Sequence, residues 1–113
     1  GPVSLDIFPD GCGPRRSYIG PQSLLTVLCD LAAFSDTLPL VLNVAAQNPV
    51  SMNAILDAAG IPWIARYVAA SGAQNIILDC QKLARLLPAA RSDNSAREIV
   101  EQWYKALKKH DIW

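Results

Sequence analysis

The fold of this chain is decided by the stretch LPLVLNVAAQNPVSMNAILDAAG, which runs over Leu38–Gly60. Its first half, Leu40–Ala45, is an apolar run broken by one asparagine and flanked on each side by a proline. So short a run predicts a buried β-strand rather than part of a helix. The apolar residues of Met52–Ala59 have helical spacing, Ser51 can cap that helix and Gly60 can end it. The stretch therefore predicts a strand, a polar turn and a helix of an α/β layer.

On the N-terminal side the sequence predicts two extended pieces and a helix. Ser4–Phe8 is typical of a short edge strand that ends in a Pro-Asp-Gly turn, and Arg15–Ile19 is a second extended piece. A helix follows from Pro21, with its apolar stripe over Leu24–Leu31 at positions i, i+3, i+4 and i+7. Because further apolar residues such as Cys29 widen the stripe, we expect this helix to be buried on more than one side.

On the C-terminal side two more strands and a helix are predicted. Pro62–Val68 is rich in aromatic and β-branched residues, which favour a strand. Asn75–Asp79 is a third short strand, and Asp79 is placed to cap a helix whose apolar side includes Leu83 and Leu87. We expect that helix to end before Pro88.

The last helix carries the most specific local signal. Ser95 and Glu98 have the spacing of a capping box, in which each side chain satisfies the other's backbone N–H. Ile99, Trp103 and Leu107 form its predicted inward stripe, together with Ala106. The alternation of strands and helices predicts an α/β lobe with a small, mostly parallel sheet of three to four short strands and about four helices.

Composition excludes several classes of function. The 113 residues suit one domain, and the 10 basic and 10 acidic residues give a formal net charge of zero. A neutral chain lacks the field that non-specific nucleic-acid binding needs, so we expect no nucleic-acid partner. Neutrality also offers little repulsion between copies, which favours self-association.

The cysteines and the absence of long apolar runs bear on location. Cys12, Cys29 and Cys80 are far apart and form no CxxC pair, which argues against a disulfide framework and a zinc site. No apolar run approaches the roughly 20 residues that a membrane span needs. We therefore expect a cytoplasmic protein without a membrane partner.

Four segments of the chain resemble a known family. Arg16–Ile19 and the helix after it are similar to the R-D-Y-I-H-V segment of extended short-chain dehydrogenases/reductases, the NAD-dependent epimerases and dehydratases of nucleotide sugars. Leu42–Ala45 and Pro49–Ser51 resemble their Y-N-I-G-x-G-x-x-V-S passage. Leu78–Pro88 resembles their L-D-x-S-K-A-R-x-x-L-G-W-x-P helix, and Ile99–Leu107 their closing helix. The segments occur in the family's order and cover almost the whole chain.

The resemblance implies one half of an enzyme. In that family an N-terminal Rossmann half binds NAD(P) and supplies the catalytic Tyr-x-x-x-Lys, whereas the half that resembles this chain forms the substrate lobe. Residues 3–113 would be that lobe, without a complete Rossmann domain, cofactor or catalytic residue of its own, and Gly1-Pro2 resembles the remnant of a cleaved tag. Tyr104 and Lys108 have the Tyr-x-x-x-Lys spacing but fall in the last helix, where chance explains them.

The resemblance also implies a ligand site. Arg16 matches the arginine that pairs with the substrate diphosphate in many family members, a role that suits its guanidinium fork. Arg15, Asn43 and Arg66 are the other candidate substrate-binding residues. The family's aspartate seven residues after the arginine is Ser23 here, and its Gly-x-Gly is Ala-Ala-Gln. These departures leave open whether the ligand is a nucleotide sugar or another phosphorylated small molecule.

Two readings of a different class accompany this one. If the Rossmann half is missing, an apolar face is bared, and a homodimer would cover it. The chain would then be a stand-alone interaction or homo-oligomerisation module. A self-sufficient enzyme would need a nucleophile such as Cys29 or Cys80 beside His110, the single histidine, but that histidine is four residues from the end of the sequence. Core or capping roles suit these cysteines better.

Overall fold

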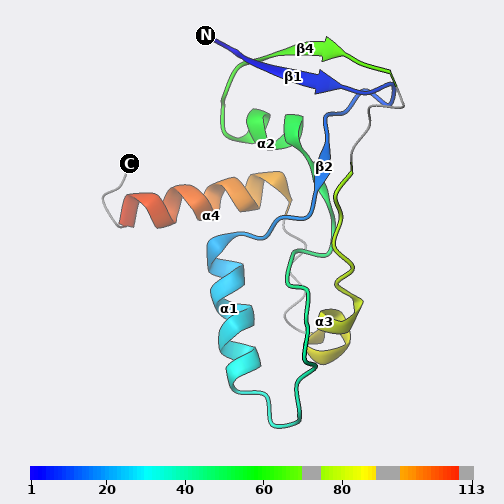
Figure 1. Cartoon of the computed structure of the whole chain (residues 1–113). Coiled ribbons are helices and arrows are strands. Elements are labelled where there is room, and N and C mark those ends of the chain that lie inside the picture. Colours follow the sequence, from blue (N-terminus) through cyan, green and yellow to red (C-terminus); the bar gives the residue numbers. More distant parts are fainter. Residues whose placement is uncertain (70–74, 89–94, 110–113) are drawn as a thin grey trace.

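A computed structural model describes residues 1–69, 75–88 and 95–109 of the chain (Figure 1). The described part contains four helices and four short strands. Their order along the chain is β1 (Val3–Ile7), β2 (Arg15–Arg16), α1 (Pro21–Ala32), β3 (Val50–Ser51), α2 (Met52–Ala58), β4 (Trp63–Tyr67), α3 (Gln81–Leu86) and α4 (Ala96–Lys109). The α/β class and the four helices agree with the expectation from sequence.

The strands form two separate sheets rather than the single sheet of three to four strands that was predicted. β1 pairs with β4 in parallel, from Val3 opposite Trp63 to Ile7 opposite Tyr67. β2 and β3 form a two-residue antiparallel pair, with Arg16 opposite Val50. A parallel pair needs a long crossover, and here the whole of α1 and α2 lies between its two strands.

β1 follows the alternation of a half-buried strand. Leu5 and Ile7 are buried, whereas Ser4 and Asp6 between them are not. After the strand the chain turns through Gly11, whose φ of +83° lies in the left-handed region that glycine tolerates. The predicted edge strand and its turn are therefore both confirmed.

The helix of the central stretch forms as predicted. The Ser51 hydroxyl accepts a hydrogen bond from the Ala54 backbone N–H at 3.4 Å, so it caps α2. Gly60 has φ +68° directly after the helix. The Tyr104 hydroxyl donates to the Ala59 carbonyl at 2.9 Å, which ties the end of α2 to α4.

The strand half of the same stretch is wrong as a prediction for the isolated chain. Leu40–Ala45 is neither strand nor helix, Leu40 is fully exposed and only Ala45 of the six is buried. Asn75–Asp79 is also irregular apart from one bridge between Arg16 and Ile76. The reason is physical: neither segment has a neighbouring strand of the right length within the part of the chain that the structure describes.

α1 and α4 are joined through one polar side chain. Gln102 accepts from the Ser23 backbone N–H and donates to the Ser23 hydroxyl, both at 2.9 Å. The capping box of α4 is confirmed, since the Glu98 N–H donates to Ser95 Oγ at 3.2 Å and the Ser95 N–H to the Glu98 carboxylate at 3.3 Å. The buried residue of α4 is Val100, which the predicted stripe omitted.

The small core beneath α1 joins three segments that are distant in sequence. Val27 of α1, Ala45, and Cys80 with Leu83 of α3 are buried together. Partly buried side chains pack around them, namely Ile19, Leu31, Leu42, Val44 and Leu87. The predicted loop at Ala69–Gln74, the link at Ala89–Asn94 and His110 lie, apart from Ala69, outside the described residues.

Candidate functional site

The structure places Arg15 in an ion pair at the end of the first turn. Its Nη1 lies 2.8 Å from Asp10 Oδ2. The Cys12 backbone N–H, which donates to Asp10 at 2.9 Å, and the Arg15 guanidinium together lower the pKa of the Asp10 carboxyl. A phosphate that recruited Arg15 would therefore have to replace Asp10 as its partner.

Arg66 has a similar neighbour on the parallel sheet. Its Nε donates to Asp6 Oδ1 at 2.7 Å, directly across the β1–β4 register. The same contact lowers the pKa of the Asp6 carboxyl. Both side chains are well exposed, so this is a surface ion pair of small energetic value.

Arg16 differs from these two arginines. It lies on β2, half-buried, and its Nη1 donates to the Arg15 carbonyl at 2.9 Å. Consecutive strand residues point to opposite faces, so Arg15 and Arg16 do not form one clamp. Of the predicted phosphate ligands, Arg16 is the one that no printed carboxylate holds in an ion pair.

Asn43 lies apart from the arginines. Its Nδ2 donates to the Asp79 carbonyl at 3.1 Å, beside α3. In Figure 1 α3 and the β1–β4 sheet with Arg66 are at opposite ends of the molecule. The four residues predicted for one substrate site therefore fall at separate places.

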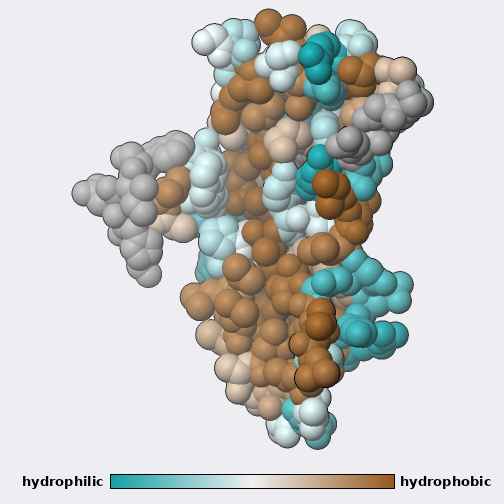
Figure 2. Space-filling model, viewed as in Figure 1, coloured by the Kyte–Doolittle hydropathy of each residue, from teal (hydrophilic) through white to brown (hydrophobic). Residues whose placement is uncertain are grey.

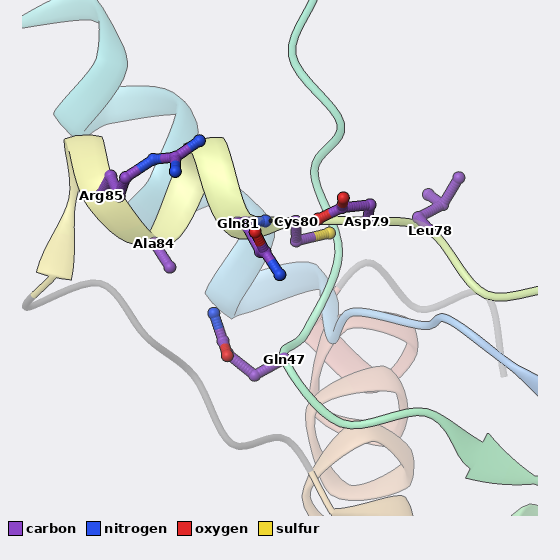
Figure 3. Close-up of a pocket in the computed structure, with 7 residues that line it drawn as sticks. All are labelled: Gln47, Leu78, Asp79, Cys80, Gln81, Ala84 and Arg85. Atoms are coloured by element: carbon purple, nitrogen blue, oxygen red, sulfur yellow. Dashed lines mark hydrogen bonds between the residues drawn. The ribbon is translucent and has the colours of Figure 1, made fainter.

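A polar groove surrounds the start of α3 (Figure 3). One part has a volume of about 500 Å³, and an adjoining part of about 280 Å³ includes Asn43. Figure 3 shows the Gln47 and Gln81 side chains extending into the space between their segments, whereas Arg85 points away along α3. The two parts together are lined by Val41, Asn43, Gln47, Leu78, Asp79, Cys80, Gln81, Lys82, Ala84 and Arg85. Amide, carboxylate and basic groups here suit a polar ligand, and they do not form a nucleophile with a base.

The groove's cysteine is not activated. Cys80 is buried, and burial raises the pKa of its thiol, the nearby Ala45 amide lowers it and the Asp79 carboxylate raises it further. A thiol with a raised pKa carries little of the nucleophilic thiolate at neutral pH. Tyr104 uses its hydroxyl to hold Ala59, as described above, so the Tyr-x-x-x-Lys spacing of α4 has a structural use.

Two further searches were made over the described residues. They contain no group of three or more His, Cys, Asp or Glu side chains that could hold a metal ion. None of the helices in that part of the chain has the length and apolar character to cross a membrane.

The most extensive surface feature is apolar. Figure 2 shows it as a continuous brown area over α1 and the segment that follows it. Leu25 is 62% exposed, Leu28 50% and Val41 72%, and Leu38 is also exposed beside the fully exposed Leu40. We call these five residues, Leu25, Leu28, Leu38, Leu40 and Val41, the α1 face. The prediction that α1 is buried on more than one side is wrong for the isolated chain, because nothing in the described residues covers this face.

The size of the surface agrees with an uncovered face. The solvent-accessible surface is 7567 Å² for a chain of 12.2 kDa. A compact monomer of that mass exposes about 6,100 Å². The radius of gyration, 16.2 Å, also exceeds the roughly 13 Å of a compact domain of this length. The excess is more than one partner's share, roughly 800 Å², of a standard-size protein interface.

Sequence reasoning did not single out Gln47, Gln81, Lys82 and Arg85 as groove residues. Lys82 and Arg85 follow Asp79 at a spacing of three, which places them along α3 and was the available signal. No protein-family model, curated protein or solved structure matched the chain.

Proposed function

We propose that this chain is the substrate-binding lobe of a protein similar to the NAD(P)-dependent epimerases and dehydratases of nucleotide sugars, and that it acts only when docked to a nucleotide-binding half. The observation that carries the proposal is the α1 face. Its five large apolar side chains are exposed to water next to a small core, as expected for a surface that another domain covers. The ordered resemblance of four segments to the family's substrate lobe supports the same assignment.

The ligand in this proposal is a phosphorylated or nucleotide-linked small molecule. Arg16 would bind its phosphate, because the other two arginines already have carboxylate partners at 2.8 Å and 2.7 Å. A bidentate guanidinium contact is among the stronger hydrogen-bonded interactions available to a phosphate. Asn43 lies near Asp79 at the groove beside α3 and is not proposed as a contact of that phosphate.

A second function, a homo-oligomerisation module, is favoured by one specific observation. The exposed apolar face belongs to a chain of formal net charge zero, so two copies can approach without repulsion. A second copy would then cover the α1 face in place of the nucleotide-binding half.

Thermal melting separates the two functions. The chain is melted at two protein concentrations, alone and with UDP-, GDP- and dTDP-sugars and nicotinamide cofactors. The first proposal predicts a higher Tm with one sugar nucleotide, lost in Arg16→Ala and kept in the control Arg97→Ala, an exposed arginine on α4. No ligand shift together with a Tm that rises with protein concentration would instead support the module.

A further inference from the structure

We infer that Leu40–Val44 becomes a β-strand when it pairs with the exposed edge of a sheet in the nucleotide-binding half, while α1 lies over the face of that sheet. This inference rests on the proposed function and names how the partner is held. It resolves the conflict between the strand predicted from sequence and the irregular segment in the structure.

The side chains of the segment already alternate as in a strand. Leu42 and Val44 pack against the core formed by α1 and α3. Val41 and Asn43, the intervening residues, are exposed. This period of two is the pattern of a strand whose inner face is covered and whose outer face awaits a cover.

The backbone of the segment has open hydrogen-bonding groups. Within the described part of the chain, Leu38–Val44 makes no backbone–backbone hydrogen bond. The segment is nevertheless fixed at its end, because the Ala46 N–H donates to the Tyr18 carbonyl at 2.7 Å and Asn43 is held by the Asp79 carbonyl. A fixed row of open N–H and C=O groups is a template for another strand, since only a strand edge offers donors and acceptors at the same spacing.

The adjacent helix indicates the kind of partner. α1 has a single charged side chain, Asp30, in its 12 residues. In contrast, α4 carries six, namely Arg97, Glu98, Glu101, Lys105, Lys108 and Lys109, in its 14 residues. A helix with so few charges is typical of one that covers the face of a sheet. Figure 1 shows the segment returning alongside α1, which is the helix-then-strand order of a unit added to a parallel sheet.

The test uses hydrogen exchange on the chain mixed with the nucleotide-binding half that the proposal expects to be encoded directly before Val3, produced as a separate protein. We expect the amides of Leu40–Val44 to exchange at least roughly 100-fold more slowly in the complex. Two variants of one residue sharpen the result. Val41→Pro removes an N–H and should weaken binding at least about tenfold, whereas Val41→Thr keeps both the N–H and the β-branched shape. Melting of each variant alone checks its fold.

The outcomes separate the inference from the proposed function. A complex in which Leu40–Val44 exchanges as fast as in the free chain, and in which the two variants bind equally, overturns the inference and leaves the proposed function standing. No complex, or no nucleotide-binding half before Val3, overturns the proposed function together with the inference. Protection of Leu40–Val44 in the chain alone at high concentration would identify a second copy as the partner and overturn the inference.

Discussion

The two ends of this molecule differ in how completely their elements find partners within the chain. At the β1–β4 end, Leu5 and Ile7 point inward and are buried. At the α1 end, Val27 is buried in the same way, but Leu25 and Leu28 on the same helix are exposed. The difference shows that an apolar pattern predicts which residues need cover, and that it is silent on whether the cover lies in the same chain.

The largest expected effect sharpens the first end of this comparison. Ile7→Ala should lower the free energy of unfolding by about 3 kcal/mol, because Ile7 is 3% exposed and the change leaves a cavity. Ile64→Ala on the neighbouring strand, 59% exposed, should cost less than about 1 kcal/mol. Urea unfolding measures both, and Ile7→Val, at about 1 kcal/mol, replaces Ile7→Ala if that variant does not fold. Equal losses at the two positions would contradict the burial of β1.

The same contrast can be drawn within α1. Val27→Ala should cost about 2 kcal/mol, since Val27 is 2% exposed and belongs to the core. Leu28→Ala, its neighbour on the α1 face, should cost less than about 1 kcal/mol in the isolated chain. The measurement is urea unfolding at two protein concentrations. If Leu28→Ala costs as much as Val27→Ala at both concentrations, the α1 face is not open.

A smaller effect concerns the cap of α4. Ser95→Ala should lower the stability by about 1 kcal/mol, because it removes the acceptor of the Glu98 N–H and frees the Glu98 side chain. Ser95→Asp keeps an acceptor at the N-cap and serves as the control. Thermal melting compares them, and an unchanged Tm for Ser95→Ala would mean that the capping box does not hold α4.

The smallest effect is the surface pair of Asp6 and Arg66. Arg66 lowers the pKa of the Asp6 carboxyl, so the pair's contribution to stability is present above the ordinary aspartate pKa and is lost as the pH falls through the lowered one. NMR titration of Asp6 should give a midpoint that rises in Arg66→Gln. A midpoint that does not move in this variant would contradict the pairing. Because both groups are exposed, we expect salt to reduce the difference.

Local signals explain how much of the fold was predictable. The cap at Ser51, the capping box at Ser95 and the turn at Gly11 are each specified by residues within a few positions, and all three form. Leu40–Ala45 was predicted as a buried strand because its composition demands cover on both faces, but the described chain offers no sheet to receive it. The prediction failed on a long-range partner and not on a local preference.

The candidate site was less predictable than the fold. Arg15 and Arg66 could be named from a resemblance, but their partners Asp10 and Asp6 depend on turn geometry and strand register. The groove beside α3 arises because Asn43 meets the Asp79 carbonyl, 36 residues away in sequence. Sequence spacing carries no information on such a contact without the fold.

The measurement that tests the account most directly is amide hydrogen exchange of the isolated chain at low micromolar concentration. We expect the paired amides of β1 and β4 to exchange at least roughly 100-fold more slowly than those of Leu40–Val44, which make no backbone–backbone hydrogen bond in the described part of the chain. This result would mean that one end of the molecule is complete and the other waits for a partner. Equal protection of the two segments would mean that Leu40–Val44 already has its partner within the chain, and would contradict the account.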